Sequence, residues 1–106
     1  MKAAVIIAGF LMLTAIGAWG VLTGDDAVDH GTKVYAMQKC ALCHSIGGIG
    51  GKKLALDGVG SRLKPDAIQK WIRTPKVMKA DTTMKSYPNL PEKDLAALTE
   101  YLMTLR

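Results

Sequence analysis

Residues 40–44 read Cys-Ala-Leu-Cys-His and hold the two cysteines of this 106-residue chain. Two residues separate the thiols, and the histidine follows the second thiol directly. Once an apolar segment near the amino terminus is set aside, roughly eighty residues remain, and domains of that size rarely stabilise themselves by apolar burial alone. We therefore expect this motif to hold a group around which the small domain folds.

The spacing of the motif is typical of covalent haem c attachment. Each thiol adds across one of two neighbouring vinyl groups of the porphyrin, and two intervening residues on a helical turn separate the sulfur atoms by about the length of that edge. The imidazole that follows then lies under the iron and donates a nitrogen to it. The sequence thus predicts one haem c, bound through Cys40 and Cys43, with His44 as an iron ligand.

Three other interpretations of the motif are weaker. A thioredoxin-like dithiol requires a strand–helix–strand context that the sequence pattern does not provide. A structural zinc site would need His30 as a further ligand, and the adjacent side chains of Cys43 and His44 would struggle to reach one tetrahedral ion. A disulfide across so short a loop would stabilise the chain little, because it removes little loop entropy.

Near the amino terminus, twenty residues from Ala3 to Leu22 carry no charge. As a helix they would span about 30 Å, the thickness of the hydrocarbon core of a bilayer. Lys2 precedes this segment, and Asp25 and Asp26 follow it. Because positive charge stays on the cytoplasmic side, the rest of the chain is expected on the periplasmic or extracytoplasmic side of the membrane.

Three interpretations of the apolar segment stay open. A retained membrane anchor is favoured over a cleaved signal peptide, because the run is long and its best cleavage site has a bulky Trp19 in the middle. A buried core helix is the third interpretation. The predicted organisation is a membrane anchor or signal peptide over residues 1–22, a polar linker over residues 23–30 and one domain over residues 31–106.

The domain is expected to be all-α, because no stretch alternates between apolar and polar residues over the length of a strand. Helices are predicted over residues 31–38, 65–74 and 91–106. The last is the clearest, since leucines recur on one stripe of it: Leu95, Leu98, Leu102 and Leu105. The glycine-rich residues 45–60 and the residues 76–90 are expected to form loops.

The far side of the haem iron needs a sixth ligand, or it stays open for chemistry. His30 falls in the predicted linker, Met37 lies on the helix that leads into the motif, and Met103 falls within the last helix, where packing is the ordinary role. Met78 and Met84 lie in the loop that would cross the far face of the porphyrin. Both methionines remain candidates on this reasoning.

Several segments together resemble the mono-haem class I cytochrome c family: Cys40–His44, Asp57–Leu63, and Thr82–Leu90 followed by the last predicted helix. The resemblance covers residues 31–106. It implies the class I cytochrome c fold, with three to four helices and loops around one covalent haem. It also implies Met84, rather than Met78, as the distal iron ligand.

The resemblance assigns supporting roles as well. Arg62 and Trp71 resemble the residues that hold the inner haem propionate, although a surface position for the arginine and simple packing for the indole stay open. Such a pair makes physical sense because an unpaired buried carboxylate is costly. Leu54 and Lys85 stand where many members have proline, and the carbonyl at the first position would hold the proximal imidazole. Gly31 would let the first helix approach the last one closely.

The predicted function is electron transfer by a carrier that is not itself an enzyme. The chain has a net charge of +5, and the stretch from Gly31 to Leu90 contains eleven basic residues but only three acidic ones. This imbalance favours docking onto an acidic protein partner, and a nucleic-acid partner is not expected because aromatic residues do not interleave with the basic ones. The lysines that could surround the haem edge are Lys39, Lys52, Lys53, Lys79 and Lys85.

Two other functions stay open at this stage. The domain could be a fixed haem-relay subunit of a larger membrane oxidoreductase, with residues 3–22 packed on partner helices. It could also be a catalyst or gas sensor with a five-coordinate iron, if no methionine reaches the distal position.

Overall fold

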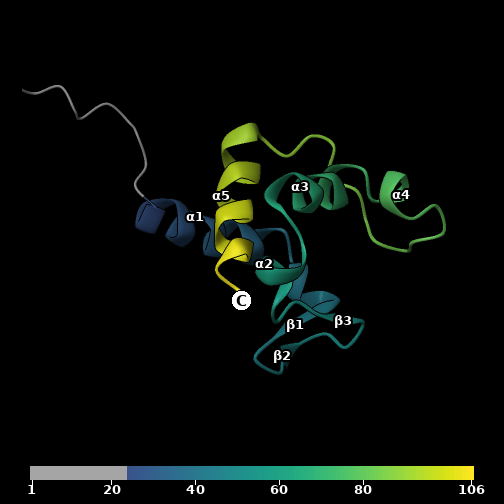
Figure 1. The fold of residues 1–106 in the computed structure, drawn as a ribbon, viewed down its shortest axis with the longest axis horizontal. Coiled ribbons are helices and arrows are strands. Elements are labelled where there is room, and N and C mark those ends of the chain that lie inside the picture. The colour runs from purple at the N-terminus through teal and green to yellow at the C-terminus, as the bar shows by residue number, and fades with distance from the viewer. Residues whose placement is uncertain (1–23) are drawn as a thin grey trace, which may run out of the picture.

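The computed structural model describes residues 24–106 (Figure 1). The predicted anchor or signal peptide over residues 1–22 lies outside this range and stays a prediction. Within the described range, none of the helices combines the length and the apolar character needed to cross a bilayer.

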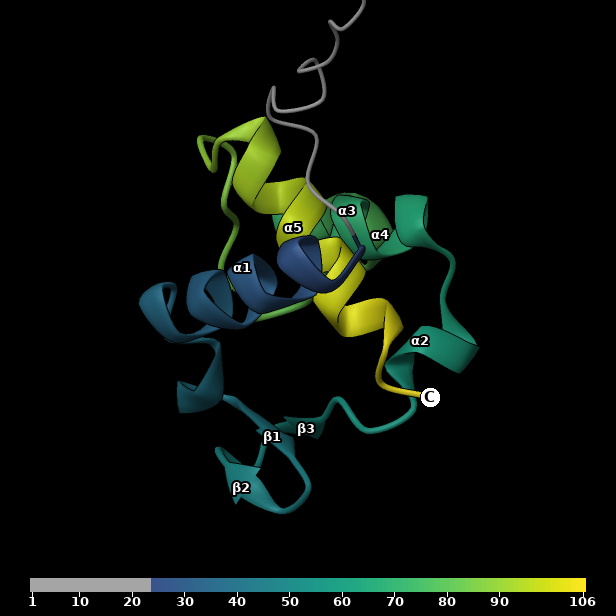
Figure 2. The ribbon, with the colours of Figure 1, turned by 90° about the vertical axis from the view of Figure 1, so that its left-hand side faces the viewer.

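Helices make up most of the described chain, and three short strands lie between them (Figure 1). In chain order the elements are α1 (Gly24–Met37), the 3-10 helix η2 (Cys40–Leu42), β1 (His44–Ile46), β2 (Ile49–Gly50), β3 (Leu54–Ala55), α2 (Val59–Arg62), α3 (Pro65–Arg73), α4 (Pro75–Met78) and α5 (Glu92–Met103). Figure 2 shows the strands as a separate part of the molecule below the helices.

The first and last helices cross at close range (Figures 1 and 2). A Cβ atom added to Gly31 on α1 would collide with the carbonyl oxygen of Ala97 on α5 and would lie 2.6 Å from the Cβ of Tyr101. Beside this contact, the rings of Tyr35 and Tyr101 meet edge to face, with centroids 5.8 Å apart. The prediction that Gly31 permits a close helix crossing is confirmed.

The leucine stripe of α5 forms the centre of the core. Leu95, Leu98 and Leu102 are buried, and Leu105 packs against the same cluster. The remaining buried apolar residues of the cluster come from α1, α2, α3 and the segment before α5: Val34, Val59, Ile68, Ile72 and Leu90. None of the residues 40–44 of the attachment motif belongs to this cluster.

The part of the predicted linker that the structure describes is the beginning of α1. Two acidic residues, Asp25 and Asp26, lie in the first turn, where they interact favourably with the helix dipole. One turn further on, Nε2 of His30 lies 2.7 Å from Oδ1 of Asp94 on α5. Residues 24–30 are therefore helical and contact the last helix. The sequence did not predict this helix, because the segment has few apolar residues that could show a helical period.

The all-α expectation is wrong for residues 44–55, which form a small three-stranded sheet in the order β2-β1-β3. β1 pairs with β2 in antiparallel fashion and with β3 in parallel fashion. The hairpin turns at Gly47 and Gly48, whose φ angles of 60° and 82° are those that two-residue hairpins require. Strands of two or three residues are too short to show alternation in a sequence.

Two further helices lie in stretches that were expected to be loops. α2 and α4 each have four residues, about one helical turn, so neither produces a recognisable apolar period. α3 begins at Pro65, as predicted, and ends one residue before Thr74, which precedes Pro75. α5 begins at Glu92 rather than at Pro91, which occupies the position just before the helix.

Candidate haem-binding site

The attachment motif forms a single tight turn after α1. Lys39 adopts a left-handed conformation, with φ of 58°, and redirects the chain from α1 into η2. The Cys43 N–H donates to the carbonyl oxygen of Cys40 at 3.2 Å, which closes the turn. No disulfide joins the two cysteines; the first is half-buried and the second exposed. The two sulfur-bearing residues thus lie on one turn, as the motif spacing predicts.

His44 begins β1, and its ring is held by a main-chain acceptor. Nδ1 lies 3.1 Å from the carbonyl oxygen of Leu54 in β3. Because a carbonyl oxygen only accepts, Nδ1 carries the proton and Nε2 keeps a lone pair that can bind a metal. The parallel register of β1 and β3 pairs these same two residues. The expected contact between the Leu54 carbonyl and the His44 imidazole is confirmed, and the role of His44 as an iron ligand stays a prediction.

The two candidate distal methionines lie near one another in the sequence but in different local structures. Met78 is the last residue of α4, whereas Met84 belongs to the extended segment between α4 and α5, and both are half-buried. The N–H of Met84 donates to Oγ1 of Thr82 at 3.2 Å. Met84 as the distal ligand stays a prediction.

The two residues expected at the haem propionate lie on neighbouring helices. Arg62 is exposed at the end of α2, and its Nη1 donates to the carbonyl oxygen of Asp57 at 2.8 Å. Trp71 is half-buried on α3. Their joint role in holding a carboxylate stays a prediction.

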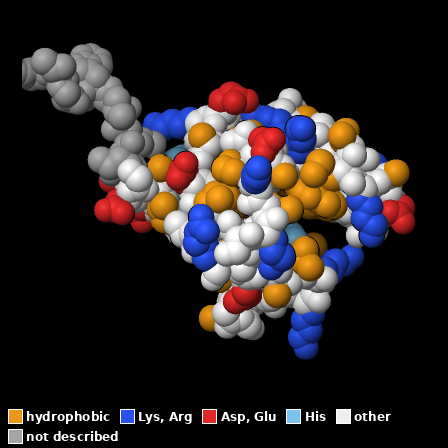
Figure 3. Space-filling model, viewed as in Figure 1, with side chains coloured by type: hydrophobic (Ala, Val, Ile, Leu, Met, Phe, Trp, Pro, Cys, Tyr) orange, Lys and Arg blue, Asp and Glu red, His pale blue; other side chains and the backbone are white. Residues whose placement is uncertain are grey.

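The donor atoms and their surroundings fit a covalently attached haem. Two free thiols lie on one turn, and the imidazole beside them has its outer nitrogen available. Large apolar side chains around the motif and on α4 are exposed to more than half of their area: Leu42, Leu54 and Val77. Figure 3 shows the surface hollowed between the strands and the lobe that contains α4, with hydrophobic side chains along the rim of the hollow. A flat apolar group would cover this surface.

The zinc interpretation does not fit the same residues. His30 lies on α1 and is paired with Asp94. Within residues 24–106, no three His, Cys, Asp or Glu side chains lie where they could hold one metal ion. The structural zinc site considered from the sequence is therefore wrong for the described part of the chain.

A protein family described as Cytochrome C oxidase, cbb3-type, subunit III matches residues 26–102 of the chain. The chain belongs to this family. It is a c-type cytochrome domain, and membership implies haem c and electron transfer through that haem. The chain is also similar to cytochrome c oxidase subunit 2 of Alkalihalophilus pseudofirmus, with 28% identity over 88 residues. The match covers 74% of this chain and 25% of the relative, so the chain spans about a quarter of that protein's length.

Two tyrosines that sequence reasoning did not place at the haem motif flank the attachment turn of this cytochrome domain; one of them, Tyr35, was expected only at the crossing of the first and last helices. Burial, together with the nearby Cys40, raises the pKa of Tyr35 to about 12, and its hydroxyl is the one buried side-chain polar atom among residues 24–106 without a hydrogen-bond partner. Burial also raises the pKa of Tyr87, whose hydroxyl donates to the carbonyl oxygen of Gln38 at 3.3 Å. A single tyrosine forms no recognisable pattern in a sequence, so the sequence could not show that these two lie close to the attachment turn.

Burial also affects the first thiol of the cytochrome motif. It raises the pKa of Cys40 to about 11, and the neighbouring Cys43 adds to the shift. The thiol of Cys40 is therefore protonated at neutral pH. In a haem-bound domain, Cys40 would hold the haem through a thioether bond, with its sulfur and its hydrogen both added across the vinyl group.

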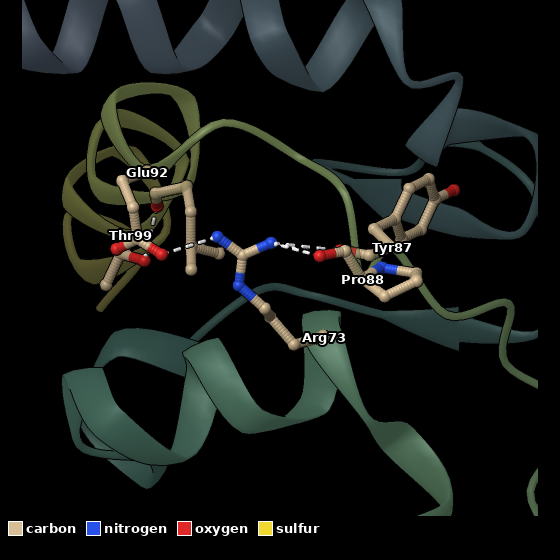
Figure 4. A network of polar contacts seen from close by, with 6 residues as sticks. Arg73, Tyr87, Pro88, Glu92 and Thr99 are labelled. Atoms are coloured by element: carbon tan, nitrogen blue, oxygen red, sulfur yellow. Dashed lines mark hydrogen bonds and ion pairs between the residues drawn. The ribbon is translucent and has the colours of Figure 1, made fainter.

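Sequence reasoning also missed Arg73, at the end of α3. Its guanidinium reaches the carbonyl oxygens of Tyr87 and Pro88 and the carboxylate of Glu92, as Figure 4 shows. An arginine in a basic stretch looks like an ordinary surface charge in a sequence, because its acceptors lie more than ten residues away along the chain.

Proposed function

We propose that this domain transfers single electrons through one haem c that is bound covalently by Cys40 and Cys43, with His44 and Met84 as axial ligands. The proposal rests on the attachment turn, where the two cysteines lie together without a disulfide and the Leu54 carbonyl fixes the imidazole with Nε2 available. A haem c bound there supplies one iron that changes between the ferric and ferrous states.

Histidine and methionine ligation leaves no open iron position for a substrate, which favours a carrier over an enzyme. A soft thioether ligand and apolar surroundings both favour the ferrous state and so raise the reduction potential. Rapid binding of carbon monoxide by the reduced native protein would instead support a five-coordinate catalyst or gas sensor.

The redox partner is proposed to be a protein with an acidic docking surface. All five lysines considered from the sequence are exposed: Lys39, Lys52, Lys53, Lys79 and Lys85. The ammonium group of the last one lies 5.3 Å from the centre of the Tyr87 ring. Exposed charges of this kind steer a partner over long range, and added salt screens them, so the association rate should fall as ionic strength rises.

The location is proposed as the periplasmic or extracytoplasmic side of a membrane, with residues 3–22 as the anchor. Support comes from the charge asymmetry around that segment and from the chemistry of the haem motif. An anchored carrier would serve neighbours in the same membrane, whereas a cleaved form would diffuse between complexes.

A second candidate function is a fixed haem relay within a larger membrane oxidoreductase. The comparisons favour it, because both the family description and the name of the relative refer to oxidase subunits. Purification of the native protein in a mild detergent separates the two candidates. A lone cytochrome supports the carrier, and stable copurification with haem-containing or copper-containing subunits supports the relay.

Intact mass spectrometry of the native protein tests the proposed cofactor. The expected mass is that of the polypeptide plus one haem, and neither cysteine should react with an alkylating reagent. The same measurement shows whether residues 1–22 are retained. A colourless protein of polypeptide mass, with both thiols reactive, would overturn the proposal.

A further inference from the structure

We propose that Arg73 is a positioning residue for the distal iron ligand. By fixing the main chain at Tyr87 and Pro88, it keeps the segment that contains Met84 in place over the haem. This inference rests on the proposed ligation by Met84 and adds a residue that neither the motif nor the family description assigns.

The guanidinium of Arg73 connects the end of α3 to the segment that leads into α5 (Figure 4). Nη1 donates to the carbonyl oxygens of Pro88 at 2.9 Å and of Tyr87 at 3.3 Å, and Nη2 donates to Oε1 of Glu92 at 2.7 Å. The arginine side chain is 22% exposed, whereas that of Glu92 is 88% exposed. The Glu92 carboxylate is thus largely solvated, and the contact with the Tyr87 carbonyl, which is partly buried, is the best protected part of the network.

Other contacts hold the same point of the chain. The N–H of Tyr87 donates to the carbonyl oxygen of Ile72 on α3 at 2.9 Å, and its hydroxyl donates to Gln38 at the end of α1. The segment before α5 is therefore fixed to both α1 and α3 three residues after Met84. A change in its position at Tyr87 would be transmitted to Met84 through only two intervening residues.

The other side of Met84 is held less firmly. Nζ of Lys76 donates to the carbonyl oxygen of Thr82 at 2.8 Å, through a contact that is exposed to solvent. A cavity of about 360 Å³ lies between α4 and this segment, and both Met84 and Arg73 line it. The polar contacts of Lys76 and Arg73 lie on either side of Met84 along this segment.

Removal of the guanidinium would therefore increase the fraction of molecules in which Met84 has left the iron. An added ligand such as imidazole binds the ferric iron only in that fraction, so its apparent affinity reports the population directly. For the oxidised haem-bound protein, Arg73→Gln should bind imidazole about tenfold more tightly than the wild type. The near-infrared sulfur-to-iron band should weaken in parallel.

The matched control is Lys70→Gln, which removes an exposed positive charge from the same helix. It should bind imidazole with wild-type affinity. Glu92→Gln should have a small effect, because its carboxylate is mostly solvated. Arg73→Lys keeps the charge but not the planar fork, so its affinity should fall between those of the wild type and Arg73→Gln.

Unfolding of the same haem-bound proteins in guanidinium chloride separates positioning from general stability. A purely structural role would lower the unfolding midpoint of Arg73→Gln without tightening imidazole binding, and that result would overturn the inference. If Arg73→Gln does not accumulate, Arg73→Lys decides alone: tighter binding than Lys70→Gln supports the inference and equal binding overturns it.

The near-infrared spectrum distinguishes a failure of the inference about Arg73 from a failure of the proposed ligation by Met84. If the oxidised wild type has no sulfur-to-iron band, or if Met84→Ala retains it, the ligation by Met84 is wrong and the inference fails with it. If the band depends on Met84 while Arg73→Gln matches Lys70→Gln, only the role of Arg73 is wrong.

Discussion

Nδ1 of His44 donates its proton to the carbonyl oxygen of Leu54, 3.1 Å away on a parallel neighbouring strand. The acceptor belongs to the main chain, so the orientation of the imidazole depends on the path of β3 and not on the side chain at that position. A leucine can therefore occupy a place where many class I cytochromes have proline. Such a second partner fixes the tautomer of a ligand histidine and raises its basicity.

Leu54→Ala should leave haem attachment and the visible spectrum unchanged. Leu54 is 55% exposed in the chain alone and would be covered by the haem, so the free energy of unfolding of the haem-bound protein should fall by about 1–2 kcal/mol. Haem content per polypeptide and an absorption spectrum of the purified variant provide the check. Loss of attached haem would show that the leucine side chain, rather than the carbonyl, orients His44.

Met84→Ala should abolish the sulfur-to-iron band of the oxidised protein, and the reduced variant should bind carbon monoxide rapidly. Its reduction potential should fall, because the thioether no longer stabilises the ferrous state. Met78→Ala is the matched control and should retain both the band and the potential. The opposite result for the two variants would assign the distal position to Met78.

Gly31→Ala should destabilise the folded domain by about 2 kcal/mol or more, because the added methyl group meets the main chain of α5. At Gly24, the start of the same helix, an added Cβ atom would have no neighbour within 4 Å, so Gly24→Ala should be neutral or slightly stabilising. Denaturant unfolding of the haem-bound proteins measures both changes. Equal stabilities would mean that α1 and α5 do not cross at this glycine.

Lys39→Gly should stabilise the protein, by about 0.5–1 kcal/mol, because a left-handed backbone costs a residue with a Cβ atom more than it costs glycine. Lys39→Ala removes the same charge but keeps the Cβ atom, so it should bring no gain. The two unfolding midpoints, compared at equal salt, test this difference. A gain in both variants would point to relief of charge repulsion instead.

Tyr35→Phe should stabilise the protein at pH 8 by about 1 kcal/mol, since it removes a buried hydroxyl that lacks a partner. The pKa of this tyrosine is raised from 10.0 to about 12 in the folded chain. Above pH 10 the unfolded chain loses this proton first, so stability decreases as pH rises towards 12. In the attached state the thioether of Cys40 does not ionise, and burial remains the cause.

The comparison of wild type and Tyr35→Phe is therefore best made at two pH values. The advantage of the phenylalanine variant in urea unfolding should be larger at pH 11 than at pH 8. Tyr87 also has a raised pKa, so some alkaline loss of stability should remain in the variant. A variant less stable than the wild type at pH 8 would show that the hydroxyl of Tyr35 has a partner in the mature protein.

Sequence alone identified the features whose chemistry depends on neighbouring residues. The distance between two thiols on one turn is set by the residues between Cys40 and Cys43, so the haem motif was recognisable without a fold. The leucine stripe of α5 was recognisable for a similar reason, because a period repeated over several turns rises above chance. The strands of two or three residues and the one-turn helices were missed, since no period can repeat within them.

Contacts between distant parts of the chain required the tertiary structure. Residues 24–30, which were predicted as a linker, form the start of α1. His30 in this segment contacts Asp94, which lies sixty-four positions further along the chain. The proton on Nδ1 of His44 and the network of Arg73 likewise depend on main-chain carbonyls, which every residue carries and no sequence pattern marks. The sequence thus determined which atoms can bind the haem, and the fold determined how those atoms are oriented and held.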